Sequence, residues 1–554
     1  MKSCRLLLAL LCVSTPGWTQ DQPHAIVSRS KWHAVAPPLN QLVPEPSSSA
    51  ITNLPPAEPA GSTSSQMDLA PNADSASQAT VDESAAAALA PLSATAGHNF
   101  LGLGTGFSGY SLQAIVPDTN LAVGPTQVVE WVNESFVVLN KSNGKVERGP
   151  VNGNTLWKSL GGTCAGHNNL DPIVQYDKLA KRWVMMMPIF VQPAYFCVAV
   201  STGSDAVTSS WHLYAFEEPG NNSSCGGCRP DPDYPKWGVW PDGYYVSFVQ
   251  GGTSENYIGA GVCVVDRNSM LKGAAAAGMQ CFTHTGTNYG AMLPADVDGT
   301  TPPPSGSPEY FMAFDYSGQA LDLWQFHVNW STPSQSKFTG PTKISVAAFS
   351  EPCGETRTEL NYTTGHCIPQ QGTSQGLDSY GDRLMYRLAY RKFGSYASLV
   401  ANHTVAVGNG TPQTAIRWYE LRNSGSGFSV HQHGTYAPGP SYRWMGSIAM
   451  DKAGDIGLGY NVSSSATHPS IRYTGRLSTD PLGQMQSEAD VLSRAGVSLG
   501  SQTTTFRWGD YSSLAVDPSD DCTFWYATEY IPSSSSPNNH WATRIASFKF
   551  PTCK

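Results

Sequence analysis

The sequence predicts an all-β protein, a β-propeller that follows a disordered N-terminal segment. Two observations support this fold class: the composition, and a strand-turn-strand pattern that recurs along the chain. Charged residues make up 14% of the 554 residues, whereas about a quarter is typical, and the chain holds 53 Gly, 40 Pro, 15 Trp and 24 Tyr. This composition suits many short strands joined by turns and argues against a helical bundle.

The recurring pattern begins near residue 113 and indicates repeated sheets. Each unit has a polar start, a short apolar strand with a small residue, a turn at Asp, Gly or Pro, and a second aromatic or β-branched strand. The units are NLAVGPTQVVEWVN from Asn120, DPIVQYDKLAKRWVMMM from Asp171, YPKWGVWPDGYYVSF from Tyr234, SIAMDKAGDIGLGYNVS from Ser447 and SLAVDPSDDCTFWYATE from Ser513, with weaker members near Asp296 and Leu377. Seven units of this kind predict seven four-stranded blades.

The first strand of each unit is expected to line the central channel, where space is short. Small residues at four of these strands fit that position: Ala122, Gly238, Ala449 and Ala515. The turn that follows carries Asp177, Asp451 or Asp517, and an aspartate in that place is more typical of a turn former than of a catalyst. An alternative fold is a pair of β-sandwich domains, but the same signature runs through the region without a linker.

The N-terminal part divides into two predicted segments ahead of the propeller, which we place at residues 99–554. Residues 1–20 have the layout of a secretory signal peptide, with Lys2 and Arg5 before a short apolar run. Residues 21–98 are rich in Ala, Pro, Ser and Thr, which predicts a disordered linker or a propeptide. No later run is long enough for a transmembrane helix, so we expect a secreted protein, either extracellular or periplasmic. We also expect the protein to be a monomer.

Ten cysteines remain after the predicted signal peptide, and an even number in an exported chain favours disulfides. Their order suggests pairing between neighbours: Cys164 with Cys197, Cys225 with Cys228, Cys263 with Cys281, Cys353 with Cys367, and Cys522 with Cys553. The Cys225–Cys228 segment could instead be a redox dithiol or half of a zinc site, but a second CxxC and nearby histidines are missing.

Three long stretches resemble a known family. RWMGSIAMDKAGDIGLGYNVSSS, GLDSYGDRLMYRLAYRKFG and RWGDYSSLAVDPSDDCTFWYATEY are similar to an uncharacterised family of secreted bacterial proteins with propeller-like repeats, over about residues 113–550. The resemblance implies the fold and an exported setting, and it assigns no catalytic residues.

Polar and aromatic residues precede several of the predicted inner strands and would surround one mouth of the channel. We interpret Asp171, Asp510 and Arg507 as candidate catalytic residues, because paired carboxylates with an arginine can cleave a glycan. The candidate ligand-binding residues are Asp118, His167, Asp233, Asp378, Arg443, Trp444 and Trp508. Convergent carboxylates could also hold a structural Ca²⁺. The competing interpretation is that the aspartates cap turns and pair with arginines, and that the tryptophans are core residues.

Other activities find less support in the sequence. The net charge of −9 shows no basic stripe for nucleic acid. The repeated S-x-D-x-G-x-T-W motif of sialidases is absent, and the match Gly372–Gly376 to a nucleophile elbow lacks its strand-to-helix context. Our leading hypothesis is therefore recognition of an extracellular ligand, a carbohydrate or other surface polymer, at the channel mouth. The alternatives are a glycan-cleaving hydrolase or lyase, and a non-catalytic scaffold for protein interactions.

Overall fold

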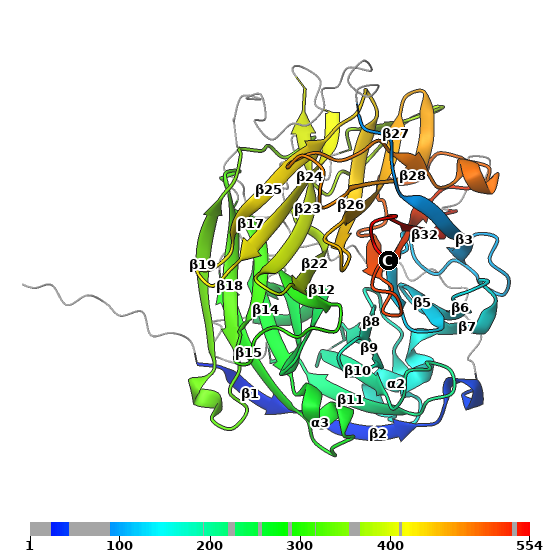
Figure 1. Cartoon of the computed structure of the whole chain (residues 1–554). Coiled ribbons are helices and arrows are strands. Elements are labelled where there is room, and N and C mark those ends of the chain that lie inside the picture. The colour runs from blue at the N-terminus through cyan, green and yellow to red at the C-terminus, as the bar shows by residue number, and fades with distance from the viewer. Residues whose placement is uncertain are drawn as a thin grey trace, which may run out of the picture.

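The computed structural model describes residues 24–43, 89–191, 193–219, 228–252, 257–285, 291–315, 317–353, 366–408, 413–533 and 540–554. These residues form a β-propeller, which confirms the predicted fold class (Figure 1). Consecutive strands pair antiparallel into small sheets, and the first strand of each sheet lies toward the centre of the molecule.

The sheets follow one another along the chain, and we name each blade by its first strand. The β4 blade has β4 (Asn120–Val123), β5 (Gln127–Val132), β6 (Ser135–Asn140) and β7 (Val146–Asn152), and the β8 blade has β8 (Ile173–Asp177), β9 (Arg182–Ile189), β10 (Tyr195–Ser201) and β11 (Trp211–Glu217). The β12 blade has β12 (Cys228–Trp240), β13 (Gly243–Gly252), β14 (Tyr257–Val265) and β15 (Gly278–Thr285), and the β16 blade has β16 (Leu293–Asp298), β17 (Glu309–Asp315), β18 (Ala320–His327) and β19 (Lys337–Ser345).

Three further blades complete the circuit. The β22 blade has β22 (Met385–Lys392), β23 (Ala397–Val407), β24 (Gln413–Asn423) and β25 (Ser429–Tyr436), and the β26 blade has β26 (Tyr442–Met450), β27 (Ile456–Ser464), β28 (Thr467–Arg476) and β29 (Ala489–Asp490). The β30 blade has β30 (Ser513–Val516), β31 (Phe524–Tyr530), β32 (Ala542–Lys549) and, from the other end of the chain, β3 (Thr95–Gly104). The shorter elements are β1 (Ile26–Arg29), β2 (Trp32–Ala36), β20 (Ile368–Gln370), β21 (Thr373–Leu377), α2 (Gly162–Gly166), α3 (Arg267–Leu271), η1 (Leu39–Gln41), η2 (Gly153–Trp157), η5 (Pro333–Gln335) and η6 (Ser493–Ala495).

The expected count of seven blades stays a prediction. The second half of β16 pairs parallel with β22, which joins the β16 and β22 blades into one eight-stranded sheet. The described strands therefore form six sheets of four or more strands, and a count of seven requires dividing the largest of them at this parallel pair.

Inner strands contact one another around the centre in the order β4, β8, β12, β16, β22, β26, β30 and back to β4. Side chains fasten several of these neighbours. The Asn120 Oδ1 atom accepts a hydrogen bond from the Val174 backbone N–H at 2.9 Å, and Ser513 Oγ donates to the Leu121 carbonyl at 3.1 Å. The Arg387 guanidinium pairs with Asp296 at 2.8 Å and with Asp298 at 2.7 Å. The two aspartates of β16 are therefore ion-pair partners, as the competing interpretation held.

Crowding between inner strands explains the small residues predicted there. A Cβ atom on Gly238 would lie 2.3 Å from the Ala295 carbonyl oxygen of the neighbouring strand, so only glycine fits. Ala122 and Ala449 are buried as well.

The predicted turn aspartates accept backbone hydrogen bonds within their own turns. Asp177 Oδ1 accepts from Ala180 N at 2.9 Å, Asp451 Oδ1 from Ala453 N at 2.8 Å, and Asp517 Oδ1 from Ser519 N at 2.8 Å. These contacts support the turn-forming role.

The segment expected to be disordered supplies three strands instead. β1 pairs with β15 and β2 with β11, and β3 pairs with β32 from Thr95 onward, before the boundary predicted at residue 99. In Figure 1 the blue β1 and β2 run along the outside of the lower blades. The expectation of disorder is thus wrong for residues 24–43, because sheet edges offer unpaired N–H and C=O groups that even a polar segment can use.

Four of the predicted disulfides are present: Cys164–Cys197, Cys263–Cys281, Cys353–Cys367 and Cys522–Cys553. The signal peptide and Cys225 lie outside the described residues, so the predicted Cys225–Cys228 pair stays a prediction. Among the described helices, none has the length and apolar character needed to cross a membrane.

Candidate functional site

Residues with a left-handed backbone lie just before or within most inner strands. This conformation is uncommon outside glycine, and aspartate is one of the residues that tolerate it best. The φ angles are 47° at Asp118, 56° at Asp171, 50° at Tyr234, 48° at Tyr380, 55° at Met445 and 53° at Asp510. Strained backbone repeated at one end of the channel is typical of a functional site.

Side chains from these turns and the adjacent residues gather into one group, which we call the mouth cluster. Its members are Asp118, Asp171, Tyr234, Lys236, Tyr380, Arg507, Asp510 and Tyr511. They precede β4, β8, β22 and β30 or, for Tyr234 and Lys236, lie within β12, so distant parts of the sequence meet at one end of the channel.

Asp171 is held by groups from two other blades. Its Oδ1 atom accepts a hydrogen bond from the Tyr511 hydroxyl at 3.1 Å, and its Oδ2 atom accepts from the Tyr234 backbone N–H at 3.3 Å. Its own N–H donates to the Asn133 side chain at 3.1 Å. The carboxylate is 6% exposed and has a fixed orientation.

Asp510 occupies a similar position at the start of the last blade. The Tyr380 hydroxyl donates to its Oδ1 atom at 2.5 Å, and Arg507 forms an ion pair with its Oδ2 atom. The Tyr234 hydroxyl reaches the Asp510 carbonyl at 3.3 Å. Tyr234 therefore links the two aspartates, one through its backbone and the other through its hydroxyl.

Asp118 is the aspartate of the mouth cluster whose ionised form is disfavoured. It is 3% exposed, and its Oδ1 atom has no hydrogen-bond partner among the described residues. Burial raises the pKa of Asp118 well above its usual range, and the neighbouring carboxylates Asp510 and Asp171 raise it further, against the opposing effect of Arg507. Asp118 can therefore keep a proton under conditions where an exposed aspartate has lost it.

Lys236 brings an amine between two aromatic rings. Its Nζ atom lies 3.3 Å from the ring centre of Tyr234 and 4.0 Å from that of Tyr511, a cation-π arrangement on both sides. Burial lowers the pKa of Lys236 to about 7, although Asp171 and the other carboxylates raise it. An amine with a pKa near neutrality beside a carboxyl with a raised pKa is typical of sites that move protons.

The structure thus brings together four of the predicted site residues: Asp118, Asp171, Arg507 and Asp510. Asp378 lies beside them, since its Oδ1 atom accepts from the Tyr380 backbone N–H at 3.1 Å and shapes the turn that carries Tyr380. Asp233 is half-buried in β12, one residue before Tyr234, and is in register with Val249.

Other predicted residues lie in different surroundings. His167 is exposed, and its Nδ1 atom is 3.1 Å from the Thr163 carbonyl oxygen of α2. Arg443 is 1% exposed and pairs with Glu488 at 2.9 Å, which helps to lower the pKa of that carboxyl to about 2. The Arg443 guanidinium is therefore engaged by a partner within its own blade.

Trp444 and Trp508 do not offer flat faces to a ligand in this structure. Both are 0% exposed, and their rings pack against each other with centres 5.5 Å apart inside an apolar cluster. Burial of large aromatic side chains between blades is the expected use of tryptophan in this fold. Their positions favour the core interpretation.

Sequence reasoning missed the aromatic and basic members Tyr234, Lys236, Tyr380 and Tyr511. Tyr234 and Lys236 stand in the repeat unit from Tyr234, and Tyr380 and Tyr511 stand in the stretches GLDSYGDRLMYRLAYRKFG and RWGDYSSLAVDPSDDCTFWYATEY, but no role was assigned to any of the four. The structural feature that joins them is the left-handed residue of successive blades, which is an aspartate, a tyrosine or, in the β26 blade, Met445. Within the described residues, no group of three His, Cys, Asp or Glu side chains is placed to hold a metal ion. The structural Ca²⁺ stays a prediction without an assigned site.

Comparisons with known proteins return structures only. No protein-family model matches the sequence, and no curated protein matches it. Among solved structures, an α-L-arabinanase from Penicillium chrysogenum has 9% identity, a TM-score of 0.32 and coverage of 69% of this chain and 98% of its own. The α-L-arabinofuranosidase PaAbf62A from Podospora anserina has 11% identity, a TM-score of 0.27 and coverage of 59% and 92%. The WD40 domain of SCAP from fission yeast has 8% identity, a TM-score of 0.28 and coverage of 79% and 85%. At these values the similarities carry no argument about the site.

Proposed function

We propose that the protein is an exported β-propeller that recognises a carbohydrate or another hydroxyl-rich surface polymer at the channel mouth. The observation that carries this proposal is the convergence of acceptors and donors in the mouth cluster, with Asp118, Asp171 and Asp510 beside Arg507 and Lys236. Hydroxyl groups both donate and accept hydrogen bonds, so a polyol ligand needs both kinds of partner.

Two details support binding at this place. The Oδ1 atom of Asp118 is an acceptor without a partner among the described residues, and leaving a buried acceptor unpaired costs about 1–3 kcal/mol. Because this atom is buried, a ligand hydroxyl would recover that cost when its binding opens access to Asp118. Arg507 keeps 17% of its side chain exposed, so it is the member best placed to meet a ligand first. The four disulfides support the exported setting.

A second candidate function is hydrolysis of the glycan, and the raised pKa of Asp118 favours it. In that reaction the proton of Asp118 passes to the leaving glycosidic oxygen as the bond from the anomeric carbon breaks. A water molecule attacks the same carbon and gives its proton to Asp171 or Asp510, while Arg507 orients the sugar. An acid and a base held in different environments are what such a reaction requires.

The decisive experiment combines binding and turnover. The protein and its Asp118→Asn and Asp510→Asn variants would be applied to a glycan array and incubated with a panel of polysaccharides. Recognition predicts array signals that both substitutions weaken by about tenfold or more, which corresponds to 1.4 kcal/mol. Hydrolysis predicts in addition the release of reducing ends by the parent protein, which Asp118→Asn abolishes.

A matched control is Asp490→Asn. Asp490 lies on the outer strand β29 and pairs with Arg472 of β28. This substitution should change neither readout. If the array is blank for the parent and no product appears, the carbohydrate proposal is wrong, and retention of specific protein partners would favour the scaffold alternative.

A further inference from the structure

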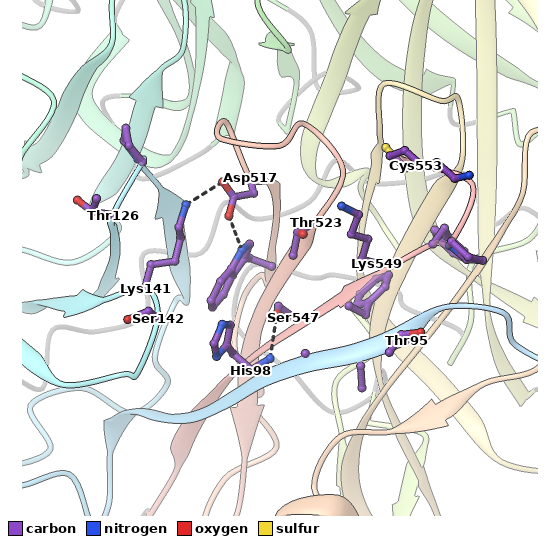
Figure 2. Close-up of a pocket in the computed structure, with 18 of the residues that line it drawn as sticks. Thr95, His98, Thr126, Lys141, Ser142, Asp517, Thr523, Ser547, Lys549 and Cys553 are labelled. Atoms are coloured by element: carbon purple, nitrogen blue, oxygen red, sulfur yellow. Dashed lines mark hydrogen bonds and ion pairs between the residues drawn. The ribbon is translucent and has the colours of Figure 1, made fainter.

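A separate pocket of about 780 Å³ lies where β3 and the end of β32 meet the turns of the β4 blade (Figure 2). Its walls come from β3, the end of β32, the turn between β30 and β31, and two turns of the β4 blade. The mouth cluster contains Asp510, which precedes β30, whereas this pocket contains Asp517 and Thr523, which follow it. The pocket therefore lies at the opposite end of that inner strand and forms a site of its own.

The inner wall of the pocket is aromatic and fixed. Trp525, Phe548 and Phe550 are each 0–1% exposed. Phe548 stacks between Tyr473, with centres 4.2 Å apart, and Phe524 at 5.2 Å. These buried rings lie beneath the cavity and give it a fixed shape, as is typical of a preformed small-molecule site.

An irregularity in β3 aims a histidine at this wall. The register between β3 and β32 shifts between Ala96 and Asn99, and the His98 backbone N–H donates to Ser547 Oγ at 2.8 Å. The His98 ring then stacks on Trp525, with centres 5.4 Å apart and planes at 15°. Bulges that redirect a side chain are over-represented beside functional sites, so this one is a second indication of a ligand site.

A built polar edge lies beside the aromatic wall. Asp517, which is 6% exposed, accepts from Trp525 Nε1 at 3.2 Å and pairs with Lys141 at 2.9 Å. The Lys141 amine also donates to the Gly124 carbonyl and to Ser519 Oγ, both at 3.0 Å, so its three protons have partners. Figure 2 shows Lys141 and Asp517 joined at one side of the pocket and Lys549 at the other.

The side chains of the lining include more lysines than acids. Its charged members are Lys141, Lys549 and Lys554 against one acid, Asp517. Lys549 pairs with Asp520 at 3.1 Å, but both side chains are more than a third exposed, and such pairs contribute little. Lys549 is therefore the lysine that can leave its partner Asp520 and pair with an anionic ligand with little loss of stability.

We propose that this pocket binds a small aromatic anion, with its ring against the exposed His98 ring, which Trp525 supports from the protein side, and its carboxylate toward Lys549. The proposal does not depend on the mouth cluster. Because the walls belong to β3 and β32, the ligand would bridge two strands that are far apart in the sequence and stabilise the closure of the propeller.

Calorimetric titration tests the proposal with 2-naphthoate as the probe and uncharged 2-naphthamide as its matched control. The expected result is that 2-naphthoate binds, that it raises the melting temperature, and that the amide binds about tenfold more weakly. Lys549→Met should remove this difference between the two ligands. Lys145→Met, at an exposed lysine outside the lining, should preserve it.

A variant that fills the pocket with a larger side chain provides a second test. Thr95 is exposed and lies in register with Lys549, so Thr95→Trp can fill the pocket from its rim without entering the core. Absence of 2-naphthoate binding to the parent protein, equal affinity for the amide, or undiminished binding to Thr95→Trp would each overturn the proposal. Asp118→Asn should leave 2-naphthoate binding unchanged, so failure at this pocket and failure at the channel mouth can be told apart.

Discussion

The Tyr511 hydroxyl donates a hydrogen bond to Asp171 at 3.1 Å, although 340 positions separate the two residues. The contact joins the start of the last inner strand to the start of the second. Since Tyr511 is 1% exposed and Asp171 is 6% exposed, neither group has water as a ready substitute. The pair shows how the mouth cluster depends on closure of the whole propeller.

Tyr511→Phe removes this bond and keeps the ring against Lys236. We expect the free energy of unfolding to fall by about 1–3 kcal/mol, because a buried carboxylate oxygen loses its partner. Urea denaturation measures the change, and Tyr442→Phe, at a half-buried tyrosine outside the cluster, is the matched control. A loss no larger than that of the control would mean that the Tyr511 hydroxyl contributes nothing.

Lys236 should make stability rise with pH above neutrality. Its pKa is lowered from 10.5 to about 7 in the folded protein, so between these values the unfolded chain binds the proton and the folded protein does not. Stability then increases with pH, by about 2 kcal/mol from pH 7 to roughly pH 9. The stability gained from the neutral Lys236 amine is lost again as the pH falls through 7.

Lys236→Met should remove that slope, because methionine does not titrate. Parallel denaturation curves at pH values of about 7, 8 and 9 measure it, with Lys145→Met as a surface control. If the parent and Lys236→Met differ by the same amount at every pH, the amine is not the titrating group.

Much of the fold could be predicted because its rules are local. Small residues such as Gly238 mark crowded inner strands, and aspartates such as Asp451 mark the turns that follow, since both requirements act within a few residues. The strands β1 and β2 could not be predicted in this way. Their partners are the free edges of β11 and β15, and composition contains no information about a distant edge.

The candidate site was predictable in part for the same reason. Asp118, Asp171 and Asp510 share a place before an inner strand, so the repeat itself brings them to one mouth. The burial of Trp508 could not be deduced, because a tryptophan before a strand can face a ligand or a neighbouring blade. Only packing distinguishes the two, and here the ring meets Trp444.

Trp508→Ala tests that distinction. A core role predicts a loss of about 3–5 kcal/mol in the free energy of unfolding, because a large cavity is left. A role in sugar stacking predicts little loss of stability and weaker glycan binding. Trp32→Ala, at a tryptophan 38% exposed, is the control, and near-equal stability of the two variants would contradict the core role.

Glu130 of β5 offers a pH test of propeller closure. Its carboxyl accepts from the Leu103 backbone N–H at 2.6 Å and from Thr543 Oγ1 at 2.7 Å, so it joins the β4 blade to β3 and β32. Burial raises its pKa from 4.5 to about 7, against these two hydrogen bonds. Between those values the folded protein keeps a proton that the unfolded chain has lost, so stability falls as the pH rises and the loss is complete above about 7.

Glu130→Gln mimics the protonated carboxyl and cannot ionise. Relative to the parent, we expect this variant to gain stability progressively from about pH 5 to about pH 8, up to about 3 kcal/mol. The shape of the gain separates this effect from packing, because a packing change would shift stability equally at all pH values. Glu147→Gln, at an exposed glutamate of β7, should show no such trend. A flat difference for Glu130→Gln would mean that closure of the propeller does not depend on a neutral carboxyl between β5, β3 and β32.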